Sequence, residues 1–416
     1  MTNPNQTAPA AEGAAPAEDP TYGDIVWGQF AKRKLAIGSL WGLISLLLLA
    51  TYAPVLASNK PFLWHTASEG WSSPWLSSLF DRNFYENSVD IFFNVALVVF
   101  TPALLPLAWW WKKTASLKRR VRAHKRTRSI QATIALFVVV FSLVQAFPQQ
   151  SPKTVYPDIE TRLVEQGEDV TAVYPVLKYS FRKISLTEVR APISLKHPLG
   201  TDNAGRDVLT RLLYGTRISL TVGVFAVALY VTFGTIIGAI AGFYGGRVDI
   251  AIQRVIEVVI CIPSLFLILT VASFITERSI FHIMVIIAGV AWTSPARLVR
   301  AEFLRMRNLD FVSAARAIGQ SELRIIFNEI LPNALAPVLV AATFGVARAI
   351  LIESSMSFLG LGDITVPSWG QILNTGRTTG IWTLILAPGF AIFLTVSLLN
   401  LVGEGVRDAL DPKLRK

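Results

Sequence analysis

Charged residues are scarce in this chain of 416 residues. Asp, Glu, Lys and Arg make up 16% of it and hydrophobic residues 52%, which is far from the balance of a soluble globular domain. Cysteine is nearly absent too, because Cys261 is the single one and no disulfide can form within the chain. We therefore predict an integral membrane protein in which Cys261 is a small apolar packing residue inside a span.

Motifs for binding ATP or metals are also missing. The chain has no G-x-x-x-x-G-K-[ST] phosphate loop, so any ATP that drives its work must bind to another polypeptide. Its four histidines, His65, His124, His197 and His282, are scattered and show no H-E-x-x-H or paired Cys/His spacing. We expect a transport protein with no catalytic residue, metal or cofactor of its own.

A series of apolar runs takes up much of the chain. A helical span needs about 20 apolar residues, and these runs are too long and too evenly apolar for the roughly 10-residue alternating strands of an outer-membrane barrel. The pattern predicts an all-α, polytopic bundle of about eight spans. The predicted spans are residues 35–57, 89–111, 130–147, 218–241, 252–275, 280–292, 334–356 and 381–402.

Basic residues are distributed unevenly around these spans. The net charge is +11, and basic clusters precede the first span, separate the second from the third (residues 112–128) and follow the fourth and sixth. Short cytoplasmic loops collect Lys and Arg, and polybasic segments there contact anionic lipid headgroups. We therefore expect these clusters and both termini to be cytoplasmic, and we assign no role to nucleic acid.

A polar stretch, "FVSAARAIGQSELRIIFNEILPN", interrupts the apolar runs at residues 311–333. It predicts two short helices, joined where Gly319 takes a positive φ and Ser321 caps the second helix, which Pro332 ends. The pattern leaves open whether their apolar faces pack on the chain's own spans or on a partner. The predicted faces are Phe311, Ala314, Ala315 and Ile318 in the first helix and Leu323, Ile326, Phe327 and Ile330 in the second.

This stretch resembles the EAA loop in permease subunits of binding-protein-dependent ABC importers. In that family, Glu-Ala-Ala, a glycine four residues after the second alanine and a closing Leu-Pro mark the coupling helices that dock on a separate ATPase subunit. The ATPase-coupling positions implied here are Ala314, Ala315, Gly319, Leu331 and Pro332, which match the pattern, and Ser313 and Glu329, which depart from it.

Other segments narrow the resemblance to the second permease subunit of the dipeptide, oligopeptide and nickel branch. They are residues 27–57, 197–223, 242–267, 357–373 and 403–414. The resemblance implies a type I importer core that forms half of a translocation path for di- or oligopeptides, with nickel or another small solute as the alternative. The implied partners are a second permease subunit, two ATPase subunits or domains that bind Mg-ATP, an extracytoplasmic solute-binding protein and the lipid of a bacterial-type inner membrane.

The chain accordingly divides into a core and peripheral segments. The segments are a disordered cytoplasmic tail (1–31), a first span (32–57), an inserted extracytoplasmic loop with an extra hairpin of spans and a basic cytoplasmic loop (58–147), an extracytoplasmic segment (148–215), a permease core (216–403) with a coupling loop (294–335), and a cytoplasmic tail (404–416). The insertion departs from the family pattern, and the sequence assigns it no role.

Two further classes of protein compete with the importer interpretation. An ion-coupled secondary transporter would work alone, but few carboxylates lie within the spans and no inverted repeat is evident. A structural membrane scaffold would not need a docking hairpin.

Small residues within the spans are candidates for packing and for the path. Gly234, Gly238 and Gly242 repeat every four residues, which favours close approach of another helix. Pro263 interrupts the fifth span, and both a static kink and a moving gate fit this interruption.

Two charged residues, Arg348 and Glu353, lie in the seventh apolar run. A charge at the bilayer centre costs roughly 2.5 to 3.5 kcal/mol, so we expect these side chains to avoid lipid. Two interpretations remain open, a structural ion pair and a lining of the translocation path.

Overall fold

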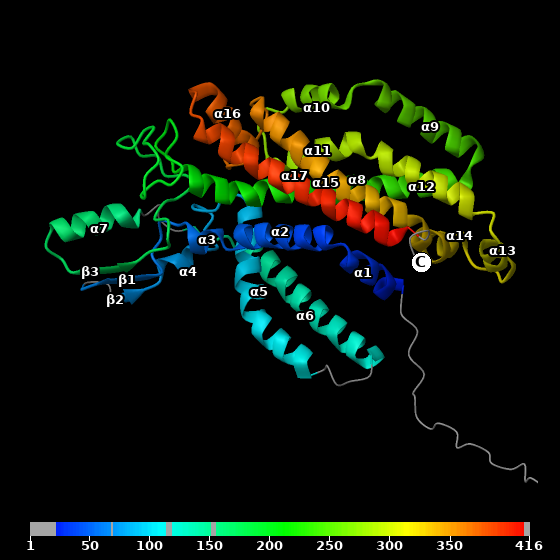
Figure 1. The fold of residues 1–416 in the computed structure, drawn as a ribbon, viewed down its shortest axis with the longest axis horizontal. Coiled ribbons are helices and arrows are strands. Elements are labelled where there is room, and N and C mark those ends of the chain that lie inside the picture. The colour runs from blue at the N-terminus through cyan, green and yellow to red at the C-terminus, as the bar shows by residue number, and fades with distance from the viewer. Residues whose placement is uncertain (1–21, 68–69, 114–118, 151–154, 412–416) are drawn as a thin grey trace, which may run out of the picture.

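The structure is a computed structural model that describes residues 22–67, 70–113, 119–150 and 155–411. Its long helices lie side by side, with a small sheet at one end of the bundle and short helices at the other (Figure 1). Within the predicted tails and basic loop, residues 1–21, 114–118 and 412–416 lie outside the described residues.

Within the described residues, six helices are long and apolar enough to cross a membrane, and the number rises to eight if each of two bent helix pairs is one span. This confirms the predicted all-α bundle of about eight spans. The six are α2 (Lys34–Thr51), α5 (Ser88–Lys113), the part Thr127–Ala146 of α6 (Arg119–Ala146), α8 (Val208–Tyr244), the segment Glu322–Phe358 that includes α15 (Leu331–Phe358), and α17 (Thr383–Leu410).

The two bent pairs coincide with the fifth and sixth predicted spans. Helices α9 (Gly246–Cys261) and α10 (Ser264–Ser273) meet at 82°, and α11 (Ile280–Ala291) and α12 (Thr293–Met306) meet at 43°. At about 1.5 Å per residue, the 12 residues of α11 cannot cross a hydrocarbon core of about 30 Å. The sixth apolar run is short because the chain bends there and continues as α12.

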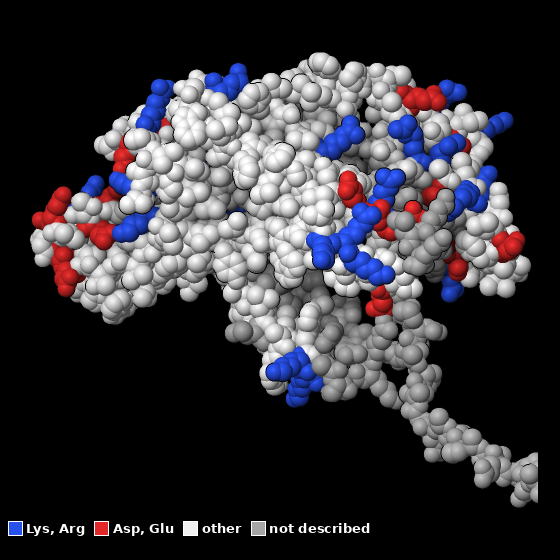
Figure 2. Space-filling view, viewed as in Figure 1, with Lys and Arg blue, Asp and Glu red and all other residues white. Residues whose placement is uncertain are grey.

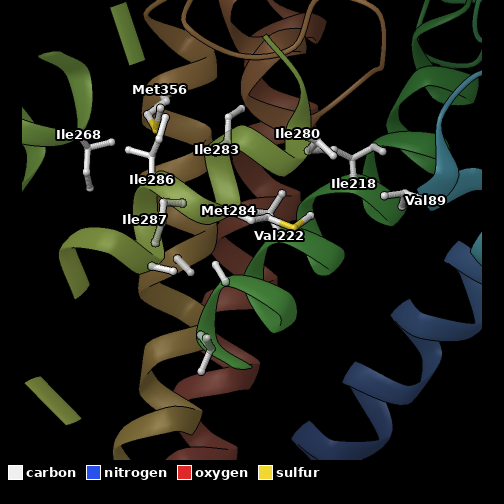
Figure 3. Packing of buried hydrophobic residues seen from close by; sticks show 14 of the residues in the cluster. Val89, Ile218, Val222, Ile268, Ile280, Ile283, Met284, Ile286, Ile287 and Met356 are labelled. Atoms are coloured by element: carbon white, nitrogen blue, oxygen red, sulfur yellow. The ribbon is translucent and has the colours of Figure 1, made fainter. Parts of the chain in front are cut away.

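A hydrophobic cluster forms around α11. One side of this helix is buried against other helices, whereas Phe281 and Val285 on its other side are exposed. Figure 3 shows Ile283 and Met284 of α11 among Val222 of α8 and Met356 of α15. The bundle core therefore lies where α8, α10, α11 and α15 meet.

A small sheet forms at one end of the bundle, in a region for which the sequence predicts no strands. Its order is β2-β1-β3, with both pairs antiparallel and His65 opposite Trp71 and Thr171. Trp64 of β1 is buried and contacts the ring of Tyr156. We call this part the sheet end; it comprises β1 (Leu63–Thr66), β2 (Gly70–Ser72), β3 (Val170–Val173), α3 (Ala53–Leu56), α4 (Pro74–Ser78) and α7 (Tyr156–Glu165).

The inserted hairpin of α5 and α6 diverges from the long helices (Figure 1). Phe92 of α5 contacts Phe137 of α6, with ring centroids 5.1 Å apart. A buried ion pair joins the hairpin to the bundle, because Nη1 of Arg217 in α8 lies 3.1 Å from Oδ1 of Asp90 in α5. Arg217 also donates from Nε to the carbonyl of Ala50 in α2 at 2.7 Å.

The charged side chains leave a band free of charge. Figure 2 shows Lys, Arg, Asp and Glu gathered over the sheet end and over the opposite end, and Lys and Arg at the tip of the inserted hairpin, with a largely uncharged band between the two ends of the bundle. A band of this kind is what a membrane protein presents to hydrocarbon.

The predicted disorder of residues 22–31 is wrong. Helix α1 (Tyr22–Lys32) occupies residues predicted to be disordered, and α17 continues to Leu410. Phe30 of α1 is buried beside Ala409 of α17, and Arg33 forms an ion pair with Asp408. The two segments order each other, which composition alone does not reveal. Helix α8 likewise begins at Val208, inside the segment predicted to be extracytoplasmic.

Cys261 also differs from its prediction. It is the last residue of α9, immediately before the break between α9 and α10, and it is exposed rather than packed inside a span.

Candidate functional site

The polar stretch forms a protruding knob at the end of the bundle opposite the sheet (Figure 1). Helix α13 (Asp310–Ala317) is followed by a turn, by α14 (Glu322–Arg324) and by the π-helix η1 (Ile325–Ile330), which continues into α15. We call residues 310–330 the knob.

Gly319 shapes the turn of the knob. Its φ is 77°, a conformation that strains residues with a side chain. The N–H of Gly319 donates to the carbonyl of Arg316, and the N–H of Gln320 donates to the carbonyl of Ala315. This pair of bonds is the Schellman motif, which satisfies the last carbonyls of a helix.

The predicted second helix of the knob begins after Ser321 as expected, but its end at Pro332 is wrong. Ser321 occupies the N-cap position, but its side chain makes no capping hydrogen bond. Pro332 does not end a helix, because it lies in the first turn of α15, where a missing N–H is tolerated. The π-helix before it has a wider turn, so the buried side is set by Ile325, Ile326 and Ile330 rather than by strict helical spacing.

The knob has one buried and one exposed apolar face. The sequence leaves open whether the apolar faces pack on the chain's own helices or on a partner. In the structure, one face packs on the chain's own helices and the other is exposed. The buried face, Val312, Ala315, Ile325, Ile326 and Ile330, packs with Phe243, Val299, Phe303 and Met306. The exposed face consists of Phe311 (39% exposed), Ile318 (76%), Leu323 (65%) and Phe327 (56%), and Leu309 (45%) lies immediately before it. The predicted helical faces are therefore wrong in part. Phe311, Ala314 and Ile318 are exposed whereas Ala315 is buried, and Leu323 and Phe327 are exposed whereas Ile326 and Ile330 are buried.

The ATPase-coupling candidates are spread over the knob and the start of α15. Ser313, Ala314, Gly319 and Pro332 are exposed, Glu329 and Leu331 are partly buried, and Ala315 is buried. The exposed candidates therefore lie on the outer face of α13, in the turn and at the start of α15, where a partner could contact them.

A row of glycines brings α12 against α8. A Cβ atom at Gly234 would lie 2.6 Å from the carbonyl oxygen of Trp292, and one at Gly242 would lie 2.7 Å from that of Arg300. A Cβ at Gly238 would clash with the carbonyl of Ala296. The glycines and their neighbours both repeat every four residues, so the two helix backbones stay close over two turns.

Polar contacts hold α12 to the helices beside it. Nη2 of Arg300 lies 2.6 Å from Oδ2 of Asp249 in α9, and Nη1 of Arg307 donates to the carbonyl of Gly242 in α8 at 3.2 Å. Since α12 leads directly into the knob, these contacts connect the knob to α8 and α9.

A cavity of about 490 Å³ lies between the broken span and the helices facing it. Its walls include Tyr230 of α8, Pro263 at the break, Arg297 of α12 and Arg348 of α15. Pro263 and Arg348, two of the three candidates for the translocation path, thus line the same space.

Pro263 causes the break in the span. Ile262 before it is extended (φ −94°, ψ 127°), as the residue before a proline prefers, and Pro263 is the N-cap of α10. The chain changes direction by 82° at this point, which opens the cavity on one side.

Glu353, the third path candidate, lies elsewhere. It is 1% exposed and accepts a hydrogen bond from Oγ of Ser357 at 2.7 Å. Near it, α16 (Trp369–Thr379) packs so closely that a Cβ at Gly370 would lie 2.5 Å from the carbonyl oxygen of Ser354. Within the described residues, Arg348 and Glu353 form no ion pair with each other, so that interpretation is wrong, and Glu353 does not line the cavity.

Sequence reasoning missed two cavity residues, Arg297 and Tyr230. Arg297 lies in the arginine-rich stretch that we interpreted as a topology signal, and Tyr230 has no signal beyond its place in an apolar run. Among the described residues, no group of three or more His, Cys, Asp or Glu side chains could hold a metal ion.

The chain is similar to known transport proteins. Residues 234–416 match the family described as the binding-protein-dependent transport system inner membrane component, and residues 21–69 match the N-terminal transmembrane domain of oligopeptide transport permease C. The dipeptide transport system permease protein DppC of Alkalihalophilus pseudofirmus is 43% identical over 53% of this chain and 74% of its own length. This chain belongs to the family of inner membrane components of binding-protein-dependent transport systems.

Other relatives agree with the assignment of this permease. The oligopeptide transport system permease protein OppC of Bacillus subtilis is 37% identical over 58% of this chain and 79% of its own length. A solved structure of the inward-facing MetNI methionine ABC transporter aligns with a TM-score of 0.41 and 18% identity, over 48% of this chain and 96% of that chain. The two family models and the two named permeases confirm the resemblance to the dipeptide and oligopeptide branch.

Proposed function

We propose that this permease forms half of the path by which an importer carries di- or oligopeptides across a membrane, with energy supplied by separate ATPase subunits. The observation that carries the proposal is that one chain of this family joins a membrane cavity to a protruding knob through the closely packed α8 and α12. The names of its relatives, dipeptide and oligopeptide permeases, support a peptide cargo over nickel or another small solute.

The exposed face of the knob is the proposed docking surface for an ATPase. Large apolar side chains gathered at an exposed site mark interaction surfaces, and burying them contributes about 25 cal/mol per Å² of apolar area. The chain has no phosphate loop, so Mg-ATP belongs to two ATPase subunits or domains. The permease itself carries no cofactor and catalyses no covalent reaction.

The sheet end is proposed to face a solute-binding protein outside the cytoplasm, and the knob end to face the cytoplasm. Both termini of the described chain lie toward the knob (Figure 1), so they are assigned to the cytoplasmic side of an inner membrane. With Cys261 replaced by serine, a cysteine at Lys112 should resist an impermeant thiol reagent in intact cells, whereas one at Gln166 should react. The reverse result would overturn this orientation.

Reconstitution tests the importer function. In lipid vesicles, the chain alone should neither hydrolyse ATP nor accumulate a dipeptide, and both activities should appear when a second permease, ATPase subunits and a binding protein are added. Dipeptide uptake by this chain alone, driven by an ion gradient, would replace the proposal with a secondary transporter.

A further inference from the structure

The charge on the cavity walls has one sign. Among the described residues that line it, the charged ones are Arg297 and Arg348, and none is Asp or Glu. The remaining walls are largely apolar, with few polar groups such as the hydroxyl of Tyr230. The cavity is therefore electropositive, and low-dielectric walls strengthen such a field.

Three other arginines in and beside the bundle have carboxylate partners. Arg217 pairs with Asp90 at 3.1 Å, Arg211 with Asp202 at 2.5 Å, and Arg300 with Asp249. These pairs remove the cost of an isolated charge away from water.

Arg297 and Arg348 differ from these three arginines. Neither has an ion pair or a side-chain hydrogen bond within the described part of the chain, and both are exposed to the cavity. Unpaired arginines in a membrane protein characteristically face the interior and mark substrate or ion pathways. The uncompensated charge indicates that an anionic group arrives from outside the chain.

We propose that Arg348, assisted by Arg297, receives the terminal carboxylate of the peptide as it passes through the cavity. The inference rests on the proposed peptide importer function and names the part of the cargo that this half of the path recognises. A guanidinium presents a planar fork of N–H donors that matches a carboxylate. The apolar walls then accept peptide side chains of varied shape, and the volume of about 490 Å³ is within the usual range for small-molecule sites.

A carboxylate can reach Arg348 from the peptide or from the second permease subunit, and a protection experiment separates these sources. The assembled permease and ATPase complex, without binding protein, is treated with phenylglyoxal, and the adduct on Arg348 is measured by mass spectrometry. A dipeptide with a free carboxylate should slow the modification, whereas the same dipeptide with a C-terminal amide should not. Equal protection by both peptides, no protection, or an Arg348 already unreactive in the complex would overturn the proposal.

Uptake measurements test the same residue during transport. In vesicles containing the complete importer, Arg348→Met should lower uptake of the free dipeptide by about tenfold, as expected for losing a charge-assisted hydrogen bond. Arg348→Lys should restore part of it, because the ammonium keeps the charge but lacks the planar fork. Arg254→Met, which removes an exposed arginine of α9 paired with Glu257, is the control and should leave uptake unchanged.

The outcomes distinguish this inference from the function on which it rests. If the unaltered complex shows no ATP-dependent dipeptide uptake, the proposed importer function fails. If it transports the dipeptide and Arg348→Met does so equally well, the carboxylate inference alone fails. Loss of the second permease from the purified Arg348→Met complex would instead assign Arg348 to the subunit interface.

Discussion

Helix α8 holds two neighbours by different means. Against α12 it presents glycines, so that backbone meets backbone over two turns. Against α5 it presents Arg217, buried and paired with Asp90. The glycine contact depends on shape and the arginine contact on charge, so the core interface and the attachment of the inserted hairpin should fail under different substitutions.

Removing the charge partner should have the largest effect. Asp90→Leu leaves Arg217 buried without its carboxylate, and breaking such a pair costs about 3 to 5 kcal/mol. We expect a much lower thermal unfolding midpoint in detergent. Because replacing both members of a buried pair by apolar residues is often neutral, Asp90→Leu with Arg217→Met should recover most of the loss. A double variant as unstable as the single one would show that the hairpin is not held by charge.

Replacing a glycine of the row by alanine should lower the stability less than Asp90→Leu does. Gly238→Ala pushes a Cβ into the carbonyl of Ala296, and overpacking of this kind costs typically about 1 to 3 kcal/mol. Gly289→Ala on α11 is the matched control, because a Cβ there meets nothing within 4 Å and alanine favours the helix. Equal unfolding midpoints for the two variants would contradict close backbone packing of α8 and α12.

A third substitution separates the knob from both interfaces. A Cβ atom at Gly319 meets nothing within 4 Å, but the φ of 77° is strained for the valine of Gly319→Val, which costs about 1 to 3 kcal/mol locally. Membrane abundance should stay near normal, while co-purification of ATPase and peptide uptake fall about tenfold. Leu48→Phe on the exposed side of α2 is the control. Undiminished ATPase binding by Gly319→Val would leave the knob without a docking role.

The smallest expected effect is a pH dependence at the start of α8. Burial opposes ionisation of Asp202, but the charge of Arg211 and hydrogen bonds from Arg206 and Ala204 outweigh it, so the pKa of Asp202 lies below its usual value. Since a depressed pKa stabilises the fold above the unfolded value of about 3.9, this contribution should be complete near pH 6 and decline as the pH falls below about 4. Asp202→Asn should flatten that decline in unfolding midpoints measured from pH 3 to pH 7. An unchanged slope would show that ionised Asp202 does not stabilise the fold.

Features that depend on local sequence were predictable. Apolar length located the spans, the spacing of Gly234, Gly238 and Gly242 indicated a close interface, and the break at Pro263 follows from a ring that removes an N–H. The positive φ of Gly319 belongs to the same class, because a helix end with glycine has few alternative conformations.

Features that depend on residues far away along the chain could not be predicted from the sequence. Glu353 lies beside serines of the bundle rather than in the cavity, and the unpaired state of Arg348 is a property of everything around it. The π-helix changes which knob residues are buried without leaving a pattern that helical periodicity can detect. Helix α1 packs against α17, a segment almost 400 residues away along the chain. The composition of residues 22–32 does not reveal this tertiary contact.

Helix α8 contains no proline and extends unbroken for 37 residues, a length of about 55 Å. One rigid rod thus carries the ion pair with Asp202, the attachment of the inserted hairpin, the wall of the cavity at Tyr230 and the glycine contact with α12. A rod of this kind acts as a lever. If the knob and α12 rotate, the far end of α8 would move with them. The inserted hairpin, which Asp90 attaches to Arg217, would then move together with α8.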